Sequence, residues 1–126
     1  MKIKTSELTG AALCYAVCMM EMPHLVWGET IGIHHASNQI VVPELPEPLC
    51  YSPFMGWAQG GQIIEREFIC ADYIHRGRWL AVKRNSDDAY SDAGEMIAGP
   101  TPLIAAMRCY VSSRCGDIVE VPDELL

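Results

Sequence analysis

The apolar positions near the start of the chain follow a helical spacing. Leu8 and Ala12 begin a series that lies on one helical face, and Pro23 cannot continue the helix beyond it. Gly10, close to the expected first turn, weakens the helix because glycine has a low helix propensity. We expect a helix over residues 7–20.

A second helix is indicated near the other end of the chain. Thr101 is placed as an N-cap, Pro102 fits the first helical position, and Gly116 is suited to the position after the last turn. Apolar residues repeat every three to four positions between them. These signals predict a helix over residues 102–115, followed by an extended tail.

Two stretches have the pattern of β-strands. Residues 31–42 are rich in β-branched side chains, with a turn signal at 37–38, and predict a hairpin. Residues 78–84 alternate, so that Leu80 and Val82 lie on one face of a strand and the residues between them on the other.

The segment between these strands is punctuated by proline and glycine. Its proline-rich part, residues 43–48, is expected to run extended across the surface. Gly61 is interpreted as the cap of a short helix from Gln62 to Phe68, because Ile63 and Ile64 share a helical face with Phe68.

These elements define a fold class. We expect an α+β fold in which the N- and C-terminal helices pack on a small, mainly antiparallel sheet that includes residues 79–82. The chain has 126 residues, half of them apolar, which fits one domain spanning residues 1–126.

The charge balance narrows the classes of partner. Nine basic and 16 acidic residues give a net charge of −7, which disfavours nucleic-acid binding unless the cations gather on one face. The apolar run over residues 8–20 is too short to span a membrane and no cleavage site follows it, so a cytoplasmic protein is expected. Its six cysteines contain no CxxC pair and are expected to be free thiols.

Soft metal ligands occur together only near the end of the first helix. Cys18, Met20, Met22 and His24 resemble a site for a soft ion, but no second ligand cluster completes it. A Met-rich helix end packed in the core explains the same residues. We therefore expect no metal and no cofactor, and no cysteine–histidine pairing indicates a catalytic nucleophile.

The segment YSPFMGWAQGGQIIERE is the main candidate for a binding site. Its glycines match no phosphate-loop motif, but an aromatic ring, amides and a cation suit a planar or anionic small molecule. A packed structural role for Trp57 explains the segment equally well. The expected ligand-binding residues are Tyr51, Trp57, Gln59, Gly60, Gly61, Glu65, Arg66 and Arg108.

Arg108 belongs to this set because it lies in the middle of the second helix. A half-buried arginine there needs a carboxylate, a phosphate or backbone carbonyls as its partner. Glu65 or Glu67 is one candidate for that partner, and a ligand is another. A structural pair and a ligand clamp both remain open.

Three stretches resemble one known family. They are KIKTSELTGAAL, YSPFMGWAQGGQIIERE and GPTPLIAAMRCYVSSRCGDIVEVPDELL, and together they are similar to the NinX-like family of tailed bacteriophages. The central motif departs from the usual family form, with Phe54, Met55 and Gly56 replacing Ser-Thr-Asp and Gln62 replacing proline. The resemblance implies a phage protein in the host cytoplasm and implies no activity.

The expected function follows from this resemblance more than from chemistry. We expect a non-enzymatic accessory protein that sequesters a small nucleotide-like defence signal in the infected host. One alternative is an acidic inhibitor of a host nuclease, defence protein or recombination factor. Another is an accessory factor in phage DNA recombination or repair, which requires a local basic patch. Self-association is compatible with each of these roles.

Overall fold

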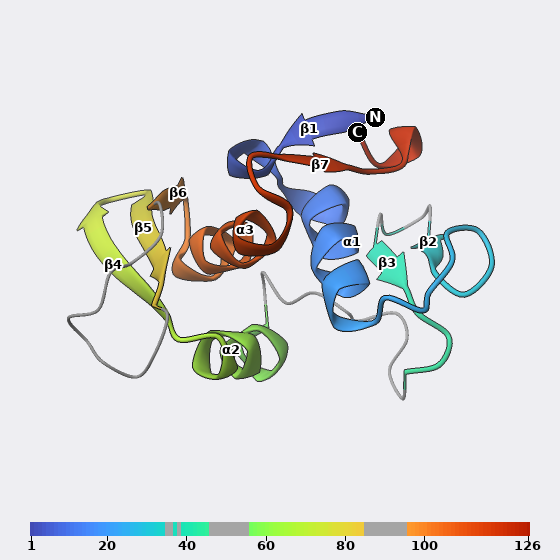
Figure 1. Ribbon diagram of the computed structural model, residues 1–126, viewed down its shortest axis with the longest axis horizontal. Helices are drawn as coiled ribbons and strands as arrows, with labels where there is room; N and C mark the ends of the chain where they lie inside the picture. The colour runs from blue at the N-terminus through green and yellow to red at the C-terminus, as the bar shows by residue number, and fades with distance from the viewer. Residues whose placement is uncertain (35–36, 38, 46–55, 85–95) are drawn as a thin grey trace.

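The computed structural model combines helices with antiparallel strands (Figure 1) and describes residues 1–34, 37, 39–45, 56–84 and 96–126. The expected α+β class is confirmed. The elements, with η marking short 3-10 helices, are β1 (Lys2–Lys4), η1 (Thr5–Glu7), α1 (Gly10–Glu21), β2 (Gly32–His34), β3 (Gln39–Val41), α2 (Trp57–Arg66), β4 (Ile69–His75), β5 (Arg78–Lys83), β6 (Ile97–Gly99), α3 (Pro102–Cys115), β7 (Ile118–Glu120) and η3 (Asp123–Leu125).

Helix α3 lies at the centre of the molecule, between the sheet of β4, β5 and β6 on one side and α1 on the other (Figure 1). The predicted helix and its caps are confirmed. Thr101 accepts a hydrogen bond from the Ile104 backbone N–H at 3.1 Å, and Gly116 leaves the helix with a φ of 79°. Tyr110, one of its residues, is among the largest fully buried side chains of the described chain.

The largest sheet has the strand order β4-β5-β6, and all its neighbours are antiparallel. Ala81 is fully buried and packs with Trp79 in the core that contains α3. Leu80 and Val82 therefore occupy the opposite face, as the alternation predicted. Strand β4, which pairs with β5, was not predicted.

Two smaller antiparallel pairs complete the described strands. Strand β1 pairs with β7, with Ile3 opposite Val119, so the two chain ends lie side by side (Figure 1). Strands β2 and β3 form the hairpin predicted within residues 31–42. The class prediction is therefore right, but the described strands form three sheets, and α3, not α1, covers the largest one.

The first helix begins later than predicted. Residues 5–7 form η1 instead, and α1 starts at Gly10, which has a φ of 55°. Leu8 is fully buried, and its extended backbone separates the two helices. Burial of this side chain accounts for the break, because a continuous helix would give Leu8 a different position.

Helix α2 begins earlier than predicted, at Trp57 instead of Gln62. Gly60 and Gly61 lie inside α2, so the interpretation of Gly61 as a cap is wrong. The helix ends at Arg66, and Phe68 lies beyond it with a φ of 55°. Burial of Gly60 and Ile63 offsets the low helix propensity of the glycines.

Buried apolar side chains form two neighbouring clusters on different sides of α1. Leu13 and Val17 belong to the cluster around α3, whereas Cys14 and Cys18 belong to the cluster beside β2 and β3. Helix α1 therefore buries most of its circumference, which explains why its sequence is apolar almost throughout.

Candidate functional site

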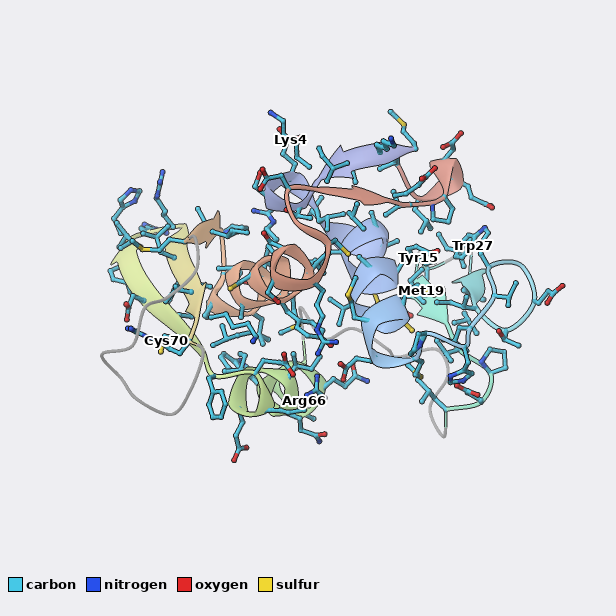
Figure 2. The ribbon with its side chains drawn as sticks, in the orientation of Figure 1. Lys4, Tyr15, Met19, Trp27, Arg66 and Cys70 are labelled. Carbon is cyan, nitrogen blue, oxygen red and sulfur yellow. The ribbon has the colours of Figure 1, made fainter. Side chains whose placement is uncertain are left out.

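Three helices are joined by a polar network around Glu21, the last residue of α1. Arg66, the last residue of α2, donates two hydrogen bonds to the Glu21 carboxylate, at 3.0 Å and 2.6 Å. The hydroxyl of Tyr110 on α3 donates to Glu21 Oε2 at 2.6 Å. Figure 2 shows Arg66 on the edge of α2, pointing toward the end of α1. We call Glu21, Arg66, Glu67, Tyr110 and Arg114 the Glu21 network.

The network extends through Glu67 to a second arginine. Arg66 Nε donates to Glu67 Oε2 at 2.9 Å, and Arg114 Nη2 donates to Glu67 Oε1 at 3.4 Å. The guanidinium groups of Arg66 and Arg114 lie 5.8 Å and 5.1 Å from the centre of the Tyr110 ring. Two carboxylates and two guanidinium groups thus neutralise each other around one buried ring.

The electrostatics of this network favour its charged form. Partial burial opposes ionisation of Glu21, but hydrogen bonds from Arg66 and Tyr110 outweigh it and lower the pKa of the carboxyl. The pKa of Glu67 is lowered in the same way, by Arg66 and Arg114 against partial burial. Burial and the bond to Glu21 raise the pKa of Tyr110, so its hydroxyl stays protonated as a donor.

Arg66, the cation that was expected to bind a ligand, is instead bound by carboxylates of the Glu21 network. The donors of Arg66 on Nε, Nη1 and Nη2 all have carboxylate acceptors within the protein. A phosphate would have to displace a bidentate carboxylate, which costs the free energy of those charge-assisted bonds. The geometry gives Arg66 a structural role in holding α2 against α1 and α3.

Arg108 is also held by the protein itself, but at a different place. Its Nε donates to the Leu8 carbonyl at 2.7 Å, and its Nη1 donates to the Ala98 carbonyl at 3.0 Å. The suggestion that Glu65 or Glu67 pairs with Arg108 is wrong, because backbone carbonyls take that place. Partial burial lowers the pKa of the Arg108 guanidinium. Arg108 thus ties the segment after η1 to β6.

The other predicted residues lie along α2, and Tyr51 lies outside the described residues. Trp57 is 59% exposed, and its ring lies beside Gly61, where a Cβ atom would be 3.8 Å from Trp57 Cε3. Gly60 is buried, Gln59 is partly buried and Glu65 is exposed. Nine residues separate Trp57 from Arg66, so they face opposite sides of α2, about 13 Å apart along its axis. The described residues of the predicted set do not meet at one concavity.

A hollow is lined by residues from η1, from β6 and from the end of α3 onward. Its volume is about 520 Å³, and we call it the Lys4 hollow. Ala98, whose carbonyl accepts from Arg108, forms part of its wall. Its lining residues are Lys4, Thr5, Ser6, Met96, Ile97, Ala98, Ser112, Asp117 and Ile118.

A second, more open hollow lies over the β2–β3 hairpin. Its volume is about 320 Å³, and its walls are largely apolar. Neither hollow contains a predicted site residue in its lining. The sequence missed the Lys4 hollow because its walls come from segments that are far apart along the chain, and it missed the second because local pattern does not show how the hairpin folds over residues 28–29. The lining residues are Gly28, Glu29, Ile31, Gly32, Ile33, His34, Val41 and Pro43.

The cysteines of the core are poorly suited to nucleophilic chemistry. Burial raises the pKa of Cys18 to about 12 and that of Cys109 to about 11, so both thiols are protonated near neutral pH. Cys18, Cys70, Cys109 and Cys115 are free thiols, as expected. Among the described residues, no three His, Cys, Asp or Glu side chains are grouped to hold a metal ion, and His24 contacts Glu44 instead.

Comparison with known proteins identifies a family. The family model described as "Bacteriophage P22, NinX" matches residues 4–114. The matched span contains every residue of the Glu21 network and Arg108, but it ends before Asp117 in the Lys4 hollow. Comparison with curated proteins finds no significant match. No helix in the described part of the chain is both long and apolar enough to cross a membrane.

Proposed function

Because this chain belongs to the bacteriophage P22 NinX family, we propose that it is a non-enzymatic accessory protein that acts by binding in the infected host. Its ligand in this proposal is a small nucleotide-like molecule, which it sequesters. A protein that works by stoichiometric binding needs a shaped surface and no activated nucleophile. The protonated thiols of Cys18 and Cys109 are consistent with that requirement.

The observation that carries the proposal is the Lys4 hollow. A volume of about 520 Å³ lies within the usual range for small-molecule sites. Lys4 supplies a cation for a phosphate, and Ile97 and Ile118 supply apolar surface for a base. Asp117 and Ser112 supply an acceptor and a hydroxyl for the ribose. This combination matches the three chemical parts of a nucleotide.

Arg108 supports the hollow without touching the ligand. Its two hydrogen bonds join Leu8, which follows η1, to Ala98 on β6, and these segments border the hollow on different sides. Arg108 is therefore a positioning residue in this proposal. Trp57, which is 59% exposed on α2, is not among the residues that line the hollow.

The test begins with protein purified from infected cells. Heat should release an intact nucleotide from the wild type, at about one molecule per chain, and mass spectrometry would identify it. Lys4→Gln and Asp117→Asn should each lower affinity for the released nucleotide about tenfold or more in calorimetry, because each removes a charged partner. Lys2→Gln is the matched control, since Lys2 is exposed on the same strand and does not line the hollow.

Several results would contradict the proposal. Conversion of the nucleotide by substoichiometric protein would identify an enzyme. A stable host protein recovered with no small molecule would support the acidic-inhibitor alternative. Equal losses in Lys2→Gln and Lys4→Gln would point to a general effect of charge. A loss confined to Trp57→Ala would move the site to α2, where the sequence first suggested it.

A further inference from the structure

The β4–β5 hairpin carries a charge opposite to that of the rest of the protein. Residues 69–84 contain four basic residues and one acidic residue, a net charge of +3, so the remainder of the chain carries −10. The acidity of the whole chain disfavours nucleic-acid binding unless the cations gather at one place. Four of the nine basic residues do gather on this hairpin.

Two of these cations are uncommitted. Arg76 and Arg78 are exposed at the turn between β4 and β5, and no described residue forms an ion pair or a hydrogen bond with either guanidinium group. They differ in this respect from Arg66 and Arg108, whose guanidinium groups form hydrogen bonds within the protein. Arg84, at the far end of β5, is about 20 Å from Arg78 along the strand.

An exposed aromatic ring accompanies these cations. Tyr73 is 59% exposed and lies edge-on to Trp79 across the β4–β5 pair, with ring centres 5.3 Å apart. Trp79 packs against the core and so fixes the position of Tyr73. A register shift between Tyr73 and His75 places a bulge beside them, and bulges re-aim the side chains of a strand.

We infer that residues 73–78, the hairpin tip, bind single-stranded nucleic acid. The exposed Tyr73 ring offers a face for stacking a base. Arg78 precedes Trp79 on β5 and so lies on the other face of the hairpin from Tyr73, and a strand that passes round the tip brings its phosphates to Arg76 and Arg78. An acidic protein partner would satisfy Arg76 and Arg78 but would leave the face of Tyr73 without a role. A duplex would bring many more phosphates near the acidic remainder of the molecule, so a short single strand fits the charge distribution better.

The binding should be weak and dependent on salt. Two phosphate contacts predict a slope of about −1.4 in a plot of log K against log salt concentration for a single strand. A dissociation constant between about 10⁻⁴ and 10⁻⁶ M is the usual range for binding without sequence preference. None of residues 73–78 lines the Lys4 hollow, so this inference does not depend on the proposed function.

Fluorescence anisotropy with labelled dT12 in 50 mM salt tests the inference. Arg76→Gln with Arg78→Gln should weaken binding at least tenfold and remove most of the salt dependence. Tyr73→Ala should weaken it about five- to 100-fold through loss of stacking, with little change in slope. The control is Lys2→Gln, which removes one charge from an exposed position on β1 and should leave binding unchanged, whereas Arg76→Gln alone removes one charge from the tip and should weaken binding.

Thermal unfolding of each variant keeps the test interpretable, because all the substituted residues are exposed and the variants should fold. The inference fails if wild-type protein does not bind dT12 under these conditions. It also fails if the β1 control loses as much affinity as the hairpin variant. Binding of polyglutamate that equals binding of dT12, and that is insensitive to Tyr73→Ala, would assign the tip to an acidic protein instead.

Discussion

Gly99 lies where β6 packs closely against α3. A Cβ atom at this position would lie 2.6 Å from the Ala105 backbone nitrogen and 2.9 Å from its Cα atom. Neither atom can move without shifting the helix. Gly99→Ala should therefore lower the free energy of unfolding by about 1–3 kcal/mol, the usual cost of overpacking. Chemical denaturation would measure it.

Gly61 provides a matched control for this prediction. A Cβ atom there would meet only Trp57 Cε3, at 3.8 Å, which is ordinary contact. Because alanine favours a helix interior over glycine, Gly61→Ala should raise stability by about 0.5–1 kcal/mol. If Gly99→Ala were neutral, or if the two variants behaved alike, the close packing of β6 on α3 would be in doubt.

At the scale of elements, the Glu21 network joins the three helices. Glu21, Arg66 and Tyr110 each come from a different helix, and α2 has few other attachments to α3. Its hydrogen bonds therefore restrain the position of α2, which buries only Gly60 and Ile63 among its own residues. Protonation of Glu21 or Glu67 should therefore weaken mainly the packing of α2 against the other two helices.

The network predicts an acid-sensitive fold. The pKa values of Glu21 and Glu67 in the folded protein lie below their ordinary value of 4.5. The unfolded chain therefore binds more protons below about pH 5, and stability falls as the pH drops through the folded pKa values. Glu21→Gln should lower the free energy of unfolding at pH 7 by about 2 kcal/mol. It should also reduce the loss of stability at acid pH, which we call the acid limb.

Glu65→Gln is the control for this experiment. Glu65 is exposed on the same helix and has no ion-pair partner among the described residues. Denaturation curves between pH 3 and 7 should show the same acid limb in this variant as in the wild type. An unchanged acid limb in Glu21→Gln would argue that other carboxyl groups determine the acid sensitivity.

The elements that the sequence predicted best are those with local signals. Helix α3 has Thr101, Pro102 and Gly116 at its ends, and the structure uses all three as expected. The start of α2 was misplaced because Gly60 and Gly61 have low helix propensity, which packing of Ile63 overrides. Strand β4 was missed because most of its residues are exposed, so its alternation is weak.

The predicted site failed to assemble for a different reason. Arg66 and Glu21 are 45 positions apart, and no local pattern tells that one satisfies the other. The position of Arg108 in the middle of a helix correctly indicated that it needs acceptors, but the sequence does not distinguish a carboxylate from a backbone carbonyl as that acceptor. The Lys4 hollow combines residues from both ends of the chain and from β6, and only the fold brings them together.

At the scale of the whole molecule, the two ends of the chain depend on each other. The Met1 amino group donates to the Val121 carbonyl at 2.8 Å, and the Thr5 hydroxyl donates to the Gly116 carbonyl at 3.0 Å. Strand β1 has no strand partner other than β7 in the described residues. Helix α1 likewise buries one side against α3, which follows it by some 90 positions.

The packing of α1 against α3 has a consequence during synthesis, because α1 is made long before α3. When α1 leaves the ribosome, the surfaces that will cover Leu13 and Val17 have not yet been made. The apolar side of α1 must wait until α3 has emerged, which at about 5–20 residues per second takes several seconds to more than ten. During that interval the nascent chain carries an uncovered apolar helix near its start. Molecular chaperones that recognise apolar segments are therefore expected to bind α1 before α3 is available to cover it.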